Sequence, residues 1–235
     1  MKILVTGANG YLGTGIVKKL CDDGHEVIAV CHSNINNVDS RATIKQCDIF
    51  ELDNPYDDLN KPEILLHTAW RNGFIHNDSS HIDDLPKHYH FIEKMINGGV
   101  KKVCVIGTMH EVGFFEGSIK ENTPNNPESL YGIAKNALRD ATKIMCKNSN
   151  VIFQWLRGYY IVGNSEQGCS IFSKITAAEK EKKALFPFTM GTNQWDFIDY
   201  NEFVNKVALA INQNEINGIV IPCSLSAISP SRRSE

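Results

Sequence analysis

Tyr131 and Lys135 lie four residues apart in the segment SLYGIAKNALR. On a helix, this spacing places the two side chains on one face, one turn apart. Tyrosine is a poor acid or base at neutral pH because its unperturbed pKa is about 10. A nearby lysine ammonium, together with an oxidised nicotinamide, favours the phenolate and would let the tyrosine transfer a proton. The same spacing also arises by chance on solvated helices, so the pair needs support from other residues.

Thr108 supplies that support, because it ends the apolar segment VCVIGT ahead of the predicted helix. Its hydroxyl could hydrogen-bond the same substrate oxygen that Tyr131 protonates. A strand-end hydroxyl, a tyrosine and a lysine beside a nicotinamide make a site for hydride transfer between an alcohol and a ketone. We therefore predict that Thr108, Tyr131 and Lys135 are catalytic.

Three glycines follow the apolar residues 3–5 in the stretch TGANGYLG, residues 6–13. Gly7 permits a tight turn, Gly10 has no side chain to obstruct a pyrophosphate, and Gly13 lets a helix pack closely on a strand. Free amide groups and the positive end of the helix dipole then face the anion. The stretch predicts a dinucleotide-binding loop between strand and helix, rather than a structural glycine turn.

No carboxylate ends the second predicted strand, where the sequence reads VCHSNINN. An acidic residue there would bind the ribose hydroxyls of NAD, whereas His32, Ser33 and Asn34 could donate hydrogen bonds to the 2′-phosphate of NADP. Arg41 is the nearest candidate for an arginine clamp on that phosphate. The pattern favours NADP, with NAD as the alternative. Asp48 is a candidate adenine contact or else an ordinary helix or turn cap.

Strand-like apolar segments alternate with helical patterns through most of the chain. This alternation implies right-handed crossovers and a parallel sheet covered on both faces. We predict an α/β fold, a doubly wound parallel sheet of the Rossmann type, with a small C-terminal substrate lobe. The predicted domains are residues 1–163 for the dinucleotide and 164–235 for the lobe, with a late strand at about 218–223 returning to the sheet. The other predicted strands are 3–6, 27–31, 43–48, 64–69, 103–107 and 151–156; the predicted helices are 12–20, 89–97, 130–147, 170–183 and 202–214, and residues 226–235 are expected to fray.

Composition limits the classes of protein and of site. The chain has 235 residues, 42% of them apolar, and a formal charge of −3, so it can bury one substantial core but lacks the basic surface that nucleic acid requires. No apolar run approaches the roughly 20 residues that span a bilayer, and no targeting segment precedes the first strand, so we expect a cytoplasmic protein. The seven cysteines are scattered without a CxxC pair, which predicts reduced, buried thiols and neither a disulfide framework nor a metal site.

Together the motifs resemble those of the extended short-chain dehydrogenase/reductase family, which contains nucleotide-sugar epimerases, dehydratases and reductases. TGANGYLG matches the family's TGxxGxxG, YGIAK its YxxxK, and HTAW an HxAA-like strand end, while LRGYYIVG and WDFIDYNEF are similar to its LRxxNVYG and RDFIHVDD segments. The resemblance covers nearly the whole chain and implies the catalytic roles already predicted. It also implies that the cofactor is bound by Tyr131 and Lys135 and by Gly7, Gly10, Tyr11, Leu12, Gly13, Asp48, Ile49, Thr68, Ala69, Trp70, Gly158, Tyr159 and Ile161.

The chain departs from the family pattern where substrates are bound. Family dehydratases carry an Asp–Glu pair directly after the catalytic threonine, but here those positions are Met109 and His110, which argues against a dehydratase. His110 could contact or protonate a sugar, or be a packed or solvated histidine. Trp195 replaces an arginine that commonly grips a nucleotide diphosphate, and Tyr160 replaces an asparagine. The candidate substrate contacts are Asn72, His110, Tyr160 and Trp195, and the missing charge could come from Lys174, Lys180, Lys182 and Lys183, which otherwise form a solvated helix face.

These observations favour a reductase that uses NADPH to reduce a keto group of a nucleotide-linked deoxysugar, with Tyr131 as the proton donor. The main alternative is a C4 epimerase, which would use the same residues and keep NAD tightly bound. Reduction of a non-sugar carbonyl and a non-catalytic dinucleotide sensor are further alternatives. Family members often dimerise through the YxxxK helix and the helix before it, so a homodimer is expected. The apolar residues that either face such a partner or pack on the sheet are Ile92, Met95, Ile96, Ala137, Leu138 and Ala141.

Overall fold

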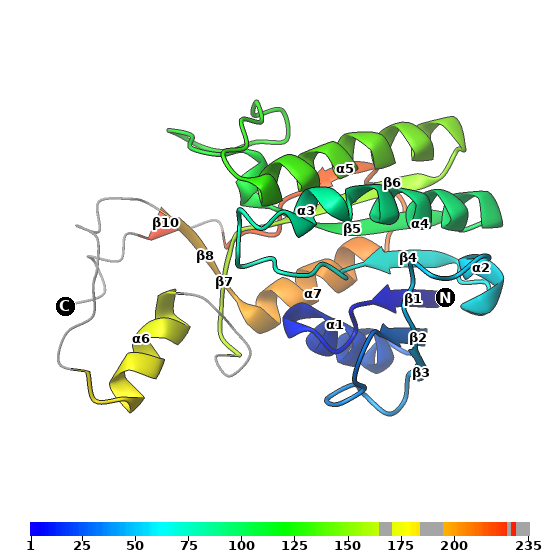
Figure 1. Cartoon of the computed structure of the whole chain (residues 1–235), viewed down its shortest axis with the longest axis horizontal. Helices are drawn as coiled ribbons and strands as arrows, with labels where there is room; N and C mark the ends of the chain where they lie inside the picture. The colour runs from blue at the N-terminus through cyan, green and yellow to red at the C-terminus, as the bar shows by residue number, and fades with distance from the viewer. Residues whose placement is uncertain (165–170, 184–194, 225–226, 229–235) are drawn as a thin grey trace.

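A parallel sheet forms the centre of the molecule (Figure 1). The computed structural model describes residues 1–164, 171–183, 195–224 and 227–228, and in this part of the chain seven strands follow the order β3-β2-β1-β4-β5-β6-β9, with every pair parallel. The strand order reverses beside β1, which pairs with β2 on one side and β4 on the other, so the predicted doubly wound α/β fold is confirmed. The strands are β1 (Lys2–Thr6), β2 (Glu26–Cys31), β3 (Thr43–Gln46), β4 (Ile64–His67), β5 (Lys102–Thr108), β6 (Ile152–Gly158) and β9 (Gly218–Val220).

Helices cover both faces of this sheet, which explains why its central strands β4 and β5 are buried along their whole length. On one face, α1 (Tyr11–Asp22) and α7 (Tyr200–Ile211) enclose one apolar core; on the other, α4 (Leu85–Gly98) and α5 (Leu130–Asn148) enclose a second. Of the residues considered for a dimer contact, Ile92, Met95, Ile96 and Leu138 belong to this second core, whereas Ala137 is exposed and Ala141 half-buried.

A second, smaller sheet lies beyond the carboxyl ends of the main strands (Figure 1). It contains β7 (Tyr160–Val162), β8 (Trp195–Asp199) and β10 (Ala227–Ile228), in the order β10-β8-β7, and α6 (Ile171–Lys180) lies between β7 and β8 in the chain. None of these three strands was predicted. The prediction that residues 226–235 fray is wrong for Ala227 and Ile228, which pair antiparallel with β8, and the other residues of that segment are outside the described part.

Several predicted elements differ from the structure at their ends. The strands predicted at 43–48, 64–69 and 218–223 end earlier in the structure, at Gln46, His67 and Val220. The helix predicted at 89–97 begins at Leu85, because Pro86 in its first turn is compatible with a helix start. The short helices α2 (Pro55–Asp58), α3 (Ser80–Asp83) and η1 (Met109–Glu111) were not predicted. β9 belongs to the main sheet, where it pairs with β6, and α7 contacts α1 on one face of that sheet. The domain boundary at residue 163 stays a prediction.

The start of α1 packs against the loop that follows β1. Gly7 has a positive φ of 65°, and a Cβ there would lie 2.9 Å from the backbone of Ala69. Gly10 is the N-cap and provides no side-chain cap, so the first amide groups of α1 keep their hydrogens for another acceptor. At Gly13 a Cβ would lie 2.2 Å from the carbonyl oxygen of Gly7. Only a residue without a side chain fits at this crossing of helix and loop.

Two buried histidines join β4 to α4. The amide groups of Thr68 and Ala69 donate to the Thr6 hydroxyl, whose own hydrogen therefore faces Nδ1 of His67 at 2.9 Å. Nε2 of His67 then donates to Nδ1 of His88 at 2.8 Å. Burial lowers the pKa of His67 well below its usual value and that of His88 to about 3, and the cation of Lys135 adds to both shifts. Both rings are therefore neutral at physiological pH.

We predict that Gly13→Ala lowers the free energy of unfolding by about 1–3 kcal/mol, the usual cost of overpacking, because the new methyl group forces α1 away from the loop. Chemical denaturation measures this change. Gly73→Ala is the control, since the nearest atom to its Cβ is Cδ1 of Trp70 at 4.0 Å, and it should behave as wild type. Equal stability of the two variants would contradict the close packing at Gly13.

We also predict that stability falls in acid because of the two histidines. The unfolded chain takes up protons as the pH drops below about 6.5, but the folded protein does not until the pH approaches the lowered values, so each ring costs up to about 1.4 kcal/mol per pH unit in that window. His88→Gln keeps an acceptor for His67 and removes one titrating ring, so unfolding measured between these limits should depend less on pH. His90→Gln, which changes an exposed histidine of the same helix, should leave the slope as it is. An unchanged slope in His88→Gln would refute the assignment.

Candidate active site

A cavity of about 440 Å³ opens at the carboxyl ends of β1, β2 and β4. Parallel doubly wound sheets bind ligands at this edge, beside the point where the strand order reverses. Eight residues predicted to contact the cofactor line the cavity: Gly7, Gly10, His32, Asp48, Ile49, Thr68, Ala69 and Trp70. The sequence analysis missed other lining residues, among them Asn9, Phe50, Arg71, Lys87 and His88. The bare glycine loop and the uncapped amide groups of α1 fit the pyrophosphate of a dinucleotide.

The remaining candidates for cofactor contact do not line this cavity. Tyr11 donates its hydroxyl to the carbonyl of Gly163, and Leu12 and Ile161 pack against the core under α1 and α7. The Ser33 carbonyl accepts from Gln46, and the Asn34 side chain accepts from Asn9. Gly13 and Gly158 serve close packing, Gly158 lying against Phe203, and the phenol of Tyr159 is buried near Arg157. Tyr131 and Lys135 lie beside the cavity rather than in its wall, on the far side of Trp70.

The residues expected to hold a 2′-phosphate are only partly available. His32 is exposed at the cavity, and its Nε2 lies 3.5 Å from the Asp48 carboxylate. The guanidinium of Arg41 donates to Asp39 at 2.7 and 2.9 Å and to Asp22 at 2.6 Å. Arg41 is therefore already neutralised by two carboxylates, and a phosphate would have to compete with them.

The three predicted catalytic residues come together at the end of β5. Thr108 is the last residue of that strand, and Tyr131 lies in the first turn of α5, which Ser129 caps by accepting from the amide of Gly132. The Thr108 hydroxyl hydrogen-bonds the phenol and lowers its pKa, but burial has the larger effect and raises that pKa to about 12. The protein's own groups thus favour the neutral phenol. The acidity expected from Lys135 together with an oxidised nicotinamide stays a prediction.

Lys135 is fully enclosed one turn further along α5. Its ammonium lies 4.0 Å from the centroid of the Trp70 ring and donates to the carbonyl of Ile106 at 2.9 Å. Burial lowers the pKa of the amine to about 7, although the nearby charge of Glu111 acts in the opposite direction. The buried amine therefore holds its proton less firmly than an exposed lysine does.

Three imidazole rings surround the Tyr131 phenol, and the sequence analysis did not assign two of them. His76, His81 and His110 have ring centroids 5.9, 5.2 and 5.6 Å from that of Tyr131. His81 accepts from the Trp70 indole at Nδ1, so its Nε2 carries the hydrogen that faces the Ile75 carbonyl. Burial lowers the pKa of His76, and lowers that of His110 to about 4. The phenol therefore lies in a wall of neutral, polar rings.

The other candidate substrate contacts lie on separate elements: Asn72 in the loop after β4, Tyr160 in β7 and Trp195 in β8. Asn72 has a positive φ of 56°, and its amide donates to the hydroxyl of Ser80. The Tyr160 ring packs at 5.5 Å from Phe197, and burial raises the pKa of its phenol. The side chain of Trp195 is outside the described residues. The four candidate lysines, Lys174, Lys180, Lys182 and Lys183, are all exposed, as expected for a solvated helix face.

Other kinds of site find no support in the described part of the chain. No cluster of three or more histidine, cysteine, aspartate or glutamate side chains there could hold a metal ion. The six cysteines within that part are free thiols. None of the helices described is both long enough and apolar enough to cross a bilayer.

Comparisons with known proteins agree with this fold and identify the family. The model of the NAD dependent epimerase/dehydratase family matches residues 3–221. The dTDP-6-deoxy-L-talose 4-dehydrogenase (NAD(+)) of Aggregatibacter actinomycetemcomitans is 42% identical over 229 residues, which are 95% of this chain and 84% of that protein. Among solved structures, the fold is similar to those of UDP-glucose 4-epimerase from Thermotoga maritima (TM-score 0.84, 21% identity, 97% and 79% of the two chains) and UDP-N-acetylglucosamine 4-epimerase from Methanobrevibacter ruminantium M1 (TM-score 0.86, 18% identity, 99% and 79%). This chain belongs to the NAD dependent epimerase/dehydratase family, as its glycine loop and YxxxK helix predicted.

Proposed function

We propose that the protein is an NAD-dependent oxidoreductase that interconverts a hydroxyl and a keto group at C4 of a dTDP-linked 6-deoxyhexose. The observation that carries the proposal is the meeting of Thr108, Tyr131 and Lys135 beside the cavity at the glycine loop. The choice of nucleotide, sugar and carbon comes from the relative that is 42% identical over 95% of the chain. A bound nicotinamide would supply or accept the hydride.

In this proposal, Tyr131 holds the proton that the substrate oxygen gains on reduction. The raised pKa of the phenol keeps it protonated at neutral pH, which suits a proton donor. Thr108 orients the same oxygen through its hydroxyl. When the proton passes from Tyr131 to the substrate oxygen, the protonated amine of Lys135 would stabilise the phenolate that remains. In the direction of oxidation, the same groups act in reverse.

The cavity residues are proposed to bind the dinucleotide. Gly7 and Gly10 would lie against the pyrophosphate, Asp48 and Ile49 against the adenosine half, and Trp70 near the nicotinamide half. NAD is favoured by the name of the relative and by the pairing of Arg41 with Asp22 and Asp39. The sequence-based preference for NADP rests on the missing carboxylate after β2 and stays a prediction, as do the homodimer and the cytoplasmic location.

The test is to incubate the purified protein with dTDP-6-deoxy-L-talose and NAD⁺, and to follow nicotinamide absorbance. Formation of NADH and a 4-keto product is expected, with the reverse reaction on adding the product and NADH. Running the reverse reaction with NADPH decides the cofactor preference. Conversion of the sugar to its C4 epimer with bound NAD and no net NADH would instead support the epimerase alternative. Binding of NADH without turnover of any nucleotide sugar would overturn the proposal.

We predict that Tyr131→Phe lowers kcat by about 100-fold or more, the usual contribution of a positioned acid–base group. The ring and its packing remain, so the dissociation constant for NADH should not change. Tyr89→Phe is the matched control. The Tyr89 hydroxyl donates to Glu93, both residues lie on α4, and Tyr89 does not line the cavity. Wild-type turnover in Tyr131→Phe would show that another group moves the proton.

A further inference from the structure

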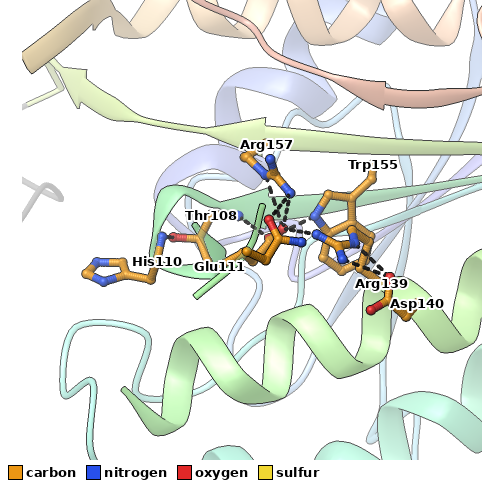
Figure 2. A network of polar contacts seen from close by, with 8 residues as sticks. Thr108, His110, Glu111, Arg139, Asp140, Trp155 and Arg157 are labelled. Atoms are coloured by element: carbon orange, nitrogen blue, oxygen red, sulfur yellow. Dashed lines mark hydrogen bonds and ion pairs between the residues drawn. The ribbon is translucent and has the colours of Figure 1, made fainter. Parts of the chain in front are cut away.

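One buried carboxylate, that of Glu111, lies beside Thr108 at the end of β5 (Figure 2). Glu111 is fully buried, and its Oε1 accepts from the amide of Thr108 at 2.7 Å and from the Trp155 indole at 2.8 Å. Its Oε2 accepts from Nε and Nη2 of Arg157 at 3.1 and 3.0 Å, and Nη1 of Arg139 lies 3.5 Å away. Hydrogen bonds to a buried charge are among the strongest in proteins.

These contacts connect every element that carries a predicted catalytic residue. Thr108 ends β5, Arg139 lies on α5 two turns beyond Tyr131, and Trp155 and Arg157 lie on β6. Figure 2 shows the side chains converging on Glu111 from the strands on one side and the helix on the other. The carboxylate thus sets the distance between the end of β5 and the helix that bears Tyr131 and Lys135.

Glu111 also determines how the Thr108 hydroxyl is used. The two residues form a capping box, in which Glu111 accepts from the Thr108 amide and Thr108 Oγ1 accepts from the His110 amide at 3.3 Å. Since Oγ1 accepts from that backbone amide, its own hydrogen is free to donate to the phenol of Tyr131 or to a substrate oxygen. The box fixes the side-chain rotamer of Thr108 in that orientation.

We propose that Glu111 is a positioning residue of this site, which holds Thr108 in register with Tyr131 and places one negative charge behind the Tyr131–Lys135 pair. The proposal rests on the proposed function, because it gives Glu111 a role in the same proton transfer. Two arginines hold the carboxylate in place.

The charge of Glu111 reaches both members of the pair. After burial, which has the largest effect, Glu111 raises the pKa of Lys135, and it also raises that of Tyr131. It adds to the raised pKa of Tyr159 as well. The other groups around the pair and the carboxylate are Arg139 and its partner Asp140 on α5, Arg157 on β6, the imidazoles His67, His76, His81, His88 and His110, and the Asn125 side chain beside Arg157.

Opposite charge changes in the cluster should move the titration of Lys135 in opposite directions. Glu111→Gln keeps the size of the side chain and removes a negative charge, so Lys135 should lose its proton at lower pH than in wild type. Arg139→Gln removes a positive charge, so the same proton should leave at higher pH. Lys143→Gln is the matched control, since it removes a positive charge from an exposed side chain of the same helix as Arg139, where water screens it, and the titration of Lys135 should be unchanged.

Nuclear magnetic resonance of protein labelled at the lysine Cε measures this titration without any substrate, and the Lys135 signal is identified by its absence in Lys135→Met. The pH dependence of sugar oxidation should move with the same signs, and kcat of Glu111→Gln should fall by about 10–100-fold as Thr108 loses its position. Shifts of equal sign in both variants, or no shift in either, would overturn the proposal. If Glu111→Gln does not fold, Arg139→Gln and its control decide alone. If no nucleotide sugar is turned over, the proposed function fails but the lysine titration still tests Glu111.

Discussion

The indole of Trp70 is the contact that both halves of the site share. It lines the cavity at the glycine loop, stacks on His88 with centroids 4.3 Å apart, and lies 4.0 Å from the Lys135 ammonium. A buried amine is costly unless it is paired, and an aromatic face with one carbonyl compensates only part of that cost. The amine therefore holds its proton weakly. A change in the position of the Trp70 ring would alter the pKa of Lys135, because the two groups are in contact.

Burial determines the chemistry of this site more than any pair of charges does. Desolvation raises the pKa of the Tyr131 phenol and lowers the pKa values of His67, His88 and His110. Each of these shifts favours the neutral form of the group. In such an interior, a single fixed charge acts over a longer distance than it would in water. This is why Glu111, which is held behind the site by Arg157 and Arg139, influences the protonation of groups that it does not touch.

The sequence predicted the parts of the site that follow from a local motif, from the helical spacing of two residues or from the position of a strand end. Thr108 and Thr68 lie at the ends of neighbouring parallel strands, and such ends meet at one edge of the sheet, so their proximity follows from the fold class. His76 and His81 lie in a segment to which the sequence analysis assigned no helix or strand, and no rule relates them to Tyr131, which comes 50 or more positions later in the chain. Glu111 carries a readable signal, since T-x-x-E is the pattern of a capping box, but its arginine partners come from distant elements. The raised pKa of Tyr131 comes mainly from burial, which residue spacing cannot reveal.

The neutral wall around Tyr131 also bears on how a nucleotide sugar would be oriented. His76 and His110 are uncharged at neutral pH and can donate or accept a single hydrogen bond on each ring nitrogen, which suits sugar hydroxyl and keto oxygens. A diphosphate instead requires cations or helix amide groups. Lys174 of α6 is an exposed cation near this wall, since its charge lowers the pKa of His76. Within the proposed function, the imidazoles would therefore face the sugar, whereas the phosphates would need a cation such as Lys174.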